Sequence, residues 1–247
     1  MSNEDRAWKA WCFRCGELGA VDKPTESLSE RIDRRKKEAA QDDAIRSVAA
    51  LPEPIDTNVA GWPPEAAVWL YKAGIGIPEI AELGAYWHAP SGRVVLPVVD
   101  DARLIYWQAR DPQWTRSSDR PKYINPLVNK DSLVARYGSA PEVVLTEDIL
   151  SAFRVGQVAE GWSLLGTALP PGVLLRLIRD GRPVAIWLDP DAAGRKAASE
   201  VRRQLDACGI PNRVIRSKRD PKLLSRRQIR LELGHNTAAP AEDAGAV

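Results

Sequence analysis

Hydrophobic and polar positions along the chain change their period near Gly92, and each side of this point predicts a different structure. Apolar residues of 63–74 recur at helical spacing behind a pair of prolines, which predicts a helix there. Residues 93–99 and 103–109 are runs of β-branched and aromatic residues, which predict two strands joined by a tight turn. The stretch 121–138 has neither period and is predicted to form a loop and a short helix.

Beyond residue 141, short apolar runs alternate with longer amphipathic runs. Alternation of this length implies a parallel sheet with crossover helices. In the last long helix Ala197, Val201, Leu205 and Cys208 fall on one stripe, which predicts that they lie in the core. The predicted fold class is therefore α/β, a parallel sheet flanked by helices and preceded by a smaller α+β subdomain rich in bases. The predicted strands are 142–146, 161–166, 183–189 and 212–216, and the predicted helices are 148–158, 172–180 and 191–209.

The composition is that of a folded soluble protein. Hydrophobic residues make up 44% and charged residues 28% of the 247 positions, which excludes a wholly disordered chain. No membrane span and no signal peptide are predicted, because the longest uncharged run is short and the N-terminus is charged. Three cysteines do not suit a disulfide framework and indicate a reducing compartment such as the cytoplasm. The expected segments are a cysteine knuckle (1–20), a charged linker or helix (21–55), a basic subdomain (56–140), the parallel-sheet domain (141–233) and a flexible tail (234–247).

Basic residues are unevenly distributed, although the formal net charge is only +2. Residues 213–230 contain eight bases and one acid, and residues 85–138 contain eight bases and five acids. Such clusters suit a polyanion such as nucleic acid, and the plain alternative is a solvated helix face. The nine tryptophans can stack on nucleobases, but core packing accounts for them more simply.

Acidic residues follow two of the predicted strands where each strand ends. Glu147 and Asp148 follow the first strand of the sheet, and Asp189 and Asp191 follow the third. The carboxyl ends of neighbouring parallel strands meet at one edge, and residues two apart in extended backbone point the same way. Oxygen ligands without histidine or cysteine favour Mg²⁺ or Mn²⁺, so Glu147, Asp189 and Asp191 are the predicted ligands. The alternative is that an aspartate at a strand–helix junction caps the helix.

These stretches resemble the Toprim domain of phage and bacterial DNA primases. The family pattern is a glutamate after the first strand, Gly-Thr after the second, Asp-x-Asp after the third and Asp-Pro after the fourth. The matching residues are Glu147, Gly166-Thr167, Asp189 with Asp191, and Asp220-Pro221. The resemblance implies that the three acids of the predicted metal site are catalytic. It also implies that Asp148 and Asp220 lie next to these ligands and assist them without binding the metal directly. Toprim domains also occur in topoisomerases and nucleases, so a metal-dependent nuclease is the rival hypothesis.

The segment upstream of the sheet resembles the basic half of the primase RNA-polymerase core. In that family a strand that begins with arginine leads to a strand that ends in arginine, then to a Lys-Tyr-(Leu/Ile)-Asn segment, then to a lysine before Tyr-Gly. The resemblance, which covers roughly residues 60–225, implies that these residues grip template strand and nucleotide phosphates. The matching residues are Arg93, Arg110, Lys122, Asn125 and Lys130, the last of them ahead of Tyr137-Gly138.

The N-terminal knuckle departs from the family. Cys12 and Cys15 resemble the second pair of a zinc ribbon, but only eleven residues precede them and no first pair is present. A structural zinc site takes four ligands, so one pair makes zinc binding doubtful. Three explanations are open: a decayed ribbon with residual ligands, a start codon placed too late, or two chains that share one zinc ion.

The resemblance as a whole implies a DNA primase, an RNA polymerase that makes short primers from ribonucleoside triphosphates on single-stranded DNA. No phosphate-binding Gly-x-x-x-x-Gly-Lys-Ser/Thr motif is present, so a replicative helicase partner is expected to be a separate polypeptide. The incomplete ribbon motivates a third hypothesis, a catalytically silent accessory of replication that binds single-stranded DNA.

Overall fold

The computed structural model describes residues 2–3, 7–11, 18–22, 50–100 and 102–234, and the chain divides into two compact units, 1–44 and 45–247. The smaller unit contains an antiparallel sheet in the order β1-β2-β3. Cys12 and Cys15 lie outside the described residues, as do most of the charged segment and the tail beyond residue 234. The strands of the smaller unit are β1 (Ser2–Asn3), β2 (Ala7–Trp11) and β3 (Leu18–Asp22).

The larger unit begins with a small antiparallel sheet in the order β4-β5-β6-β7. The two strands predicted around the turn at Asp100 are confirmed as β5 and β6, and the helix predicted after Pro63 is confirmed as α2. Helix α3 was not predicted, because its seven residues are too few to show a clear apolar period. The elements are η1 (Val59–Gly61), α2 (Pro64–Lys72), α3 (Ile77–Leu83), β4 (Tyr86–His88), η2 (Ala89–Ser91), β5 (Arg93–Asp100), β6 (Arg103–Arg110) and β7 (Tyr123–Ile124).

A five-stranded sheet in the order β12-β11-β9-β10-β8 follows, and it confirms the predicted α/β class. Strands β12, β11, β9 and β10 are parallel to one another, whereas β8, at one edge, runs antiparallel to β10. The expectation of a loop and short helix before residue 138 is wrong for β8, because Ala135–Gly138 pairs with the open edge of β10. The strands are β8 (Ala135–Gly138), β9 (Val143–Thr146), β10 (Glu160–Ser163), β11 (Val184–Ile186) and β12 (Asn212–Val214).

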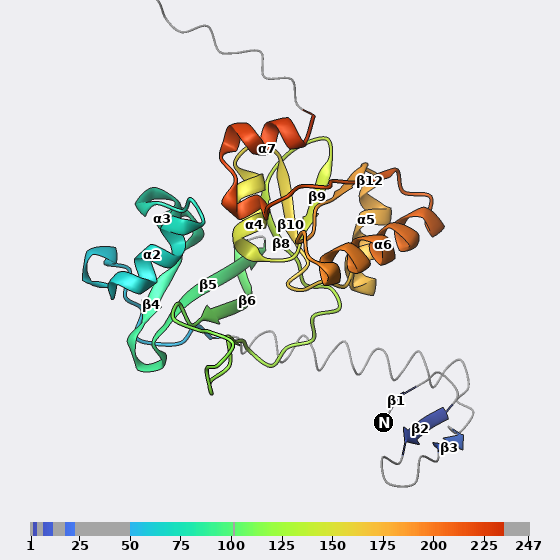
Figure 1. Ribbon diagram of the computed structural model, residues 1–247, viewed down its shortest axis with the longest axis horizontal. Helices are drawn as coiled ribbons and strands as arrows, with labels where there is room; N and C mark the ends of the chain where they lie inside the picture. The colour runs from blue at the N-terminus through green and yellow to red at the C-terminus, as the bar shows by residue number, and fades with distance from the viewer. Residues whose placement is uncertain (1, 4–6, 12–17, 23–49, 101, 235–247) are drawn as a thin grey trace, which may run out of the picture. The chain divides into compact units, whose positions relative to one another are not determined.

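Helices cover both faces of this sheet, which explains why its strands are apolar at successive positions (Figure 1). On one face Val143 and Leu145 pack with residues of α5 and α6, and on the other Val144 packs with residues of α4 and α7. The first turns of α4 also enter the core of the small antiparallel sheet, so this helix joins the two sheets. The helices are α4 (Ile149–Gly156), α5 (Pro171–Asp180), α6 (Ala192–Ala207), η3 (Pro221–Leu223) and α7 (Arg226–Glu232).

The core stripe of α6 differs from the predicted one at its end. Val201 and Leu205 are buried as predicted, and Ala197 is partly buried against the same core, beside the buried Ala198. Cys208 is exposed, so its assignment to the core is wrong. The helix ends at Ala207 and Cys208 caps it, which takes this side chain out of the helical period. Among the residues that the structure describes, no helix is long and apolar enough to cross a membrane.

Candidate active site

The acids that follow β9 and β11 emerge side by side. The two strands are parallel neighbours, with Leu145 opposite Ile186 in the register. The backbone N–H of Asp189 donates a hydrogen bond of 3.0 Å to Oε1 of Glu147. The structure therefore brings these two predicted acids to one sheet edge, as the strand pattern requires.

The loop after β10 fixes the backbone at Glu147. The N–H of Gly166 donates to the Glu147 carbonyl at 3.0 Å, and the Ser163 hydroxyl donates to the same carbonyl at 3.3 Å. Gly166 has a φ of +159°, and Leu165 before it lies in the left-handed region at +55°. This strained turn gives a physical role to the Gly-Thr position of the motif, since it sets where the Glu147 side chain begins.

Asp191 is the N-cap of α6, which is the alternative that the sequence left open. Its Oδ1 accepts a hydrogen bond of 2.8 Å from the N–H of Gly194. A Cβ on Gly194 would lie 2.1 Å from the Asp189 carbonyl oxygen and 2.9 Å from Oε1 of Glu147. Only glycine therefore lets the first turn of α6 approach the acids this closely.

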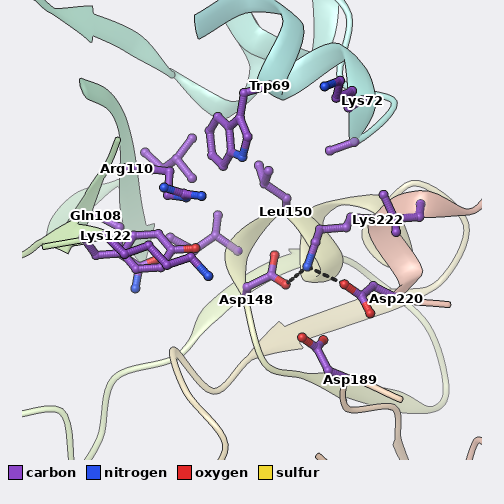
Figure 2. Close-up of a pocket in the computed structure, with 15 residues that line it drawn as sticks. Trp69, Lys72, Gln108, Arg110, Lys122, Asp148, Leu150, Asp189, Asp220 and Lys222 are labelled. Carbon is purple, nitrogen blue, oxygen red and sulfur yellow. Dashed lines mark hydrogen bonds and ion pairs between the residues drawn. The ribbon is translucent and has the colours of Figure 1, made fainter. Parts of the chain in front are cut away.

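Asp148 and Asp220 share a partner that the sequence did not single out. The ammonium group of Lys222 lies 2.7 Å from Oδ2 of Asp148 and 3.0 Å from Oδ2 of Asp220 (Figure 2). Asp148 also caps α4, since its Oδ1 accepts a 3.0 Å hydrogen bond from the N–H of Ser151. Burial alone would lower the pKa of Lys222, but Asp148, Asp189 and Asp220 together outweigh this effect and raise that pKa above the ordinary lysine value.

The carboxylates carry more negative charge than their neighbours balance. Burial and the charges of Asp189 and Asp191 raise the pKa of Glu147 to about 7. Burial and the charges of the other aspartates also raise the pKa of Asp189 to about 6, although Lys222 opposes this rise. All the donors are hard oxygens, so a divalent cation such as Mg²⁺ or Mn²⁺ suits this excess of charge.

The described residues contain no ready-made cluster of three metal-ligating side chains. The hydrogen bonds explain this arrangement, because oxygens of Glu147 and Asp191 accept backbone N–H groups and Lys222 draws two other acids to itself. The donor set fits the predicted ion in chemistry and in charge, although Oε1 of Glu147 and Oδ1 of Asp191 each accept a backbone N–H.

A pocket of about 330 Å³ separates the acids from a basic and aromatic wall. Figure 2 shows Arg110 and Lys122 on this wall, across from Asp148 and Asp189, with Trp69 beside Arg110. The guanidinium carbon of Arg110 lies 5.8 Å from the centre of the Trp69 ring. The lining residues are Trp69, Lys72, Ala73, Leu96, Gln108, Arg110, Lys122, Tyr123, Asp148, Ile149, Leu150, Asp189, Asp220, Lys222 and Leu223.

Cross-strand pairing builds this wall. Arg110 at the end of β6 is the register partner of Tyr123 in β7, and its guanidinium carbon lies 5.4 Å from the centre of that ring. Lys122 lies 5.5 Å from the ring of Trp114. Burial and the neighbouring charges of Arg110 and Lys222 lower the pKa of Lys122, so the cations of the wall repel one another.

The remaining predicted basic-region residues lie elsewhere. Arg93 is 2% exposed, and its guanidinium donates to the carbonyl oxygens of Pro121 at 2.7 Å and Lys122 at 3.2 Å. Its position therefore supports the segment that carries Lys122 and gives it no access to a ligand. Neither Asn125 nor Lys130 lines the pocket, and the ammonium of Lys130 lies 5.0 Å from the ring of Tyr106.

Solved structures define the class of this architecture, which is the fold of the primase catalytic core. The chain is similar to a DnaG primase catalytic domain bound to single-stranded DNA, with a TM-score of 0.56, 17% identity and coverage of 82% of this chain and 80% of that one. The zinc-binding and RNA polymerase domains of Aquifex aeolicus primase give a TM-score of 0.58 at 18% identity, over 85% of this chain and 63% of that one.

A phage structure has the same fold. The primase fragment of the bacteriophage T7 primase-helicase protein gives a TM-score of 0.50 at 16% identity, over 92% of this chain and 98% of that one. No protein-family model and no curated protein matches the sequence. At these identities the likeness shows the fold, and the residues of the pocket must carry any statement about activity.

Proposed function

We propose that this protein is a DNA primase, which makes short RNA primers on single-stranded DNA by metal-dependent nucleotidyl transfer. The observation that carries the proposal is the charge arrangement of the pocket. Asp189, with a raised pKa, lies on one side with Asp148 and Asp220, and Lys122, with a lowered pKa, lies with Arg110 on the other. Glu147, whose pKa is also raised, does not line the pocket but accepts the backbone N–H of Asp189. A divalent cation bound to a nucleoside triphosphate supplies the missing counter-charge to both sides at once.

In this proposal Glu147, Asp189 and Asp191 hold Mg²⁺ or Mn²⁺. The bound ion supplies charge neutralisation and alignment of phosphate oxygens. The chain's own contribution is to hold the carboxylates in place, through the Asp189 N–H on Glu147 and the cap that Asp191 makes on α6. These contacts fix the donors before a nucleotide arrives, so little reorganisation accompanies catalysis.

The opposite wall serves the nucleotide and the template. Arg110 and Lys122 provide cations for phosphates, and the rings of Trp69 and Tyr123 provide flat apolar surface beside them. The apolar side chain of Leu150 lines the same pocket. Catalysis then comes from positioning an attacking 3′-hydroxyl against an α-phosphate, with pyrophosphate leaving.

The names of the similar structures support the choice of partners. One primase catalytic domain of this fold is described as bound to single-stranded DNA, and the phage fragment belongs to a primase-helicase protein. We therefore propose single-stranded DNA as the template and a replicative helicase as the partner of this chain.

Incorporation of radiolabelled ribonucleotides on varied single-stranded templates, with Mg²⁺ or Mn²⁺, tests the proposal. The full chain should yield short oligoribonucleotides, and Asp189→Asn should abolish them. Asp206→Asn is the matched control, because Asp206 is an exposed acid on α6. Absence of any product from the wild type across many templates contradicts the proposal. Template cleavage without ribonucleotides would instead indicate a nuclease, and metal-independent DNA binding without synthesis would indicate an accessory.

A further inference from the structure

The fold holds the side chain of Lys222 between the acids of the site, in contact with Asp148 and Asp220. It lies in η3, between Pro221 and Leu223, and its side chain is 24% exposed. Pro221 is buried, and the carbonyl of Leu224 accepts a 2.9 Å hydrogen bond from the guanidinium of the buried Arg154 in α4. The backbone that carries Lys222 is thus fastened to the same helix that Asp148 caps.

The ammonium group of Lys222 forms ion pairs with two of the acids, Asp148 and Asp220. One oxygen of Asp148 lies 2.7 Å from it, and this oxygen also accepts a 2.9 Å hydrogen bond from the Ser151 hydroxyl. The other oxygen of Asp148 accepts the N–H of Ser151, so both oxygens have partners within the chain. Asp220 contacts the ammonium from the other side at 3.0 Å. The ammonium therefore offsets one of the two negative charges of this pair without a metal ion.

The acids divide into two groups by their partners. Asp148 and Asp220 contact Lys222, whereas Glu147 and Asp191 make their hydrogen bonds to backbone N–H groups. Asp189 lies in the field of both groups, since Lys222 opposes the rise of its pKa and the other acids add to it. In a two-metal site the ions lie about 3.5–4 Å apart, and a second ion here would need oxygens of Asp148 or Asp220, which contact Lys222.

We propose that Lys222 is a permanent cation of this site and takes the place of a second divalent ion. The inference rests on the proposed metal-dependent function. The site binds one divalent ion through Glu147, Asp189 and Asp191, while the ammonium of Lys222 holds Asp148 and Asp220 and offsets one of their two charges. A cation supplied by the fold is always present, so the second position does not depend on the concentration of free metal.

Mn²⁺ alone is titrated into the full chain, and its binding is measured by isothermal titration calorimetry and by electron paramagnetic resonance. These two measurements test the assignment. Wild type should bind one ion per chain at the site, and Asp189→Asn should lose it. Lys222→Met removes the charge but keeps an unbranched chain, so it should bind a second ion and show the broadened spectrum of a coupled Mn²⁺ pair. Lys222→Arg should restore a single ion, and Lys218→Met, which changes an exposed lysine, should match wild type.

The outcomes separate this inference from the proposed function. One ion in wild type and one ion of equal affinity in Lys222→Met overturns the role of Lys222 and leaves the metal-dependent function in place. Two ions in wild type also overturn the role of Lys222. This measurement uses the wild-type chain alone, so it does not depend on the folding of any variant. No ion in wild type but one in Lys222→Met contradicts metal dependence and overturns Lys222 as the substitute for a second ion, since it would then exclude the first. No ion in either chain overturns both.

Discussion

The backbone N–H of Asp189 donates a 3.0 Å hydrogen bond to Oε1 of Glu147, which joins the ends of two neighbouring strands. The contact orients the Glu147 carboxyl, but it does not remove the repulsion from the surrounding acids. Burial and these charges raise the pKa of Glu147 to about 7, well above the usual value of 4.5. The site therefore stores unfavourable charge near neutral pH when no cation is bound.

Glu147→Gln should stabilise the metal-free protein above neutral pH. A carboxyl group with a raised pKa gives its full contribution to stability below pH 4.5, and this contribution is lost as the pH rises through about 7. Glutamine keeps an oxygen that accepts the Asp189 N–H but carries no charge. At pH 8 with chelator, the free energy of unfolding should rise by about 1–2 kcal/mol, allowing for partial solvent screening. Urea unfolding between pH 4 and 8.5 measures it.

The gain from Glu147→Gln should disappear as the pH falls to 4.5, where wild type is itself protonated. Asp206→Asn, a change of an exposed acid, should show no such trend. Equal stability of Glu147→Gln and wild type at pH 8 would contradict the charge stored in the site. A gain that persists at pH 4.5 would assign the effect to packing.

Gly194→Ala should damage both the fold and the site. The new Cβ would lie 2.1 Å from the Asp189 carbonyl oxygen, so the first turn of α6 must move away from the acids. We expect a loss of about 2–4 kcal/mol in the free energy of unfolding, as for an overpacked core position, and weaker binding of Mn²⁺. Gly209→Ala is the control for unfolding, because a Cβ there meets no atom within 4 Å and feels only its backbone strain. Equal losses at the two positions would contradict the close approach.

The parallel sheet and the edge that carries the acids could be predicted because their signals are local. Runs such as 183–189 are apolar throughout and end in acids, and a sheet covered on both faces requires that pattern. Strand β8 could not be found in this way. It is short and has a partly exposed, basic sequence, and only its pairing with β10 makes it a strand.

The roles of individual cations depend on contacts between distant segments. Lys222 contacts Asp148, which lies 74 positions away in the sequence. The count of bases in 213–230 therefore showed Lys222 only as one member of a basic cluster suited to nucleic acid or to a solvated helix face. Arg93 matched a family position, but nothing in its neighbours revealed that its guanidinium is buried against backbone carbonyls. In both cases the contacts of the side chain depend on segments that are distant in the sequence, so the sequence pattern alone did not reveal them.

Trp69→Ala should weaken the binding of nucleoside triphosphates. The ring is half-buried and lines the pocket beside Arg110, where it offers a face to a nucleobase. Base stacking on an aromatic ring contributes roughly 1–3 kcal/mol, so affinity should fall roughly 5- to 150-fold. Trp69→Phe should keep most of it. Titration calorimetry with a triphosphate measures the loss, and Trp107→Phe, outside the pocket lining, is the control. An unchanged affinity in Trp69→Ala would place the base elsewhere.

Lys122→Gln should reduce the salt dependence of single-stranded DNA binding, if Lys122 contacts a phosphate. Each such contact contributes about 0.7 to the slope of log affinity against log salt for single strands. The pKa of Lys122 is lowered by burial and by Arg110 and Lys222, so phosphate binding there relieves repulsion between cations. Fluorescence anisotropy with a labelled oligonucleotide at several salt concentrations gives the slope. A slope equal to that of wild type would remove Lys122 from the DNA contact.

Arg93→Met should behave differently, although the family resemblance places both residues in one role. Its guanidinium donates to the carbonyls of Pro121 and Lys122, and the substitution removes both of these hydrogen bonds, although the Lys122 carbonyl keeps the N–H of Asp111. We expect a loss of about 2–4 kcal/mol in the free energy of unfolding and an unchanged salt slope for the folded fraction. Arg93→Lys should not restore stability, because a point charge cannot reproduce the planar fork. A reduced salt slope in Arg93→Met would show that this arginine reaches phosphate after all. An unchanged slope would show that Arg93 positions the segment of the wall, whereas Lys122 contacts the phosphate.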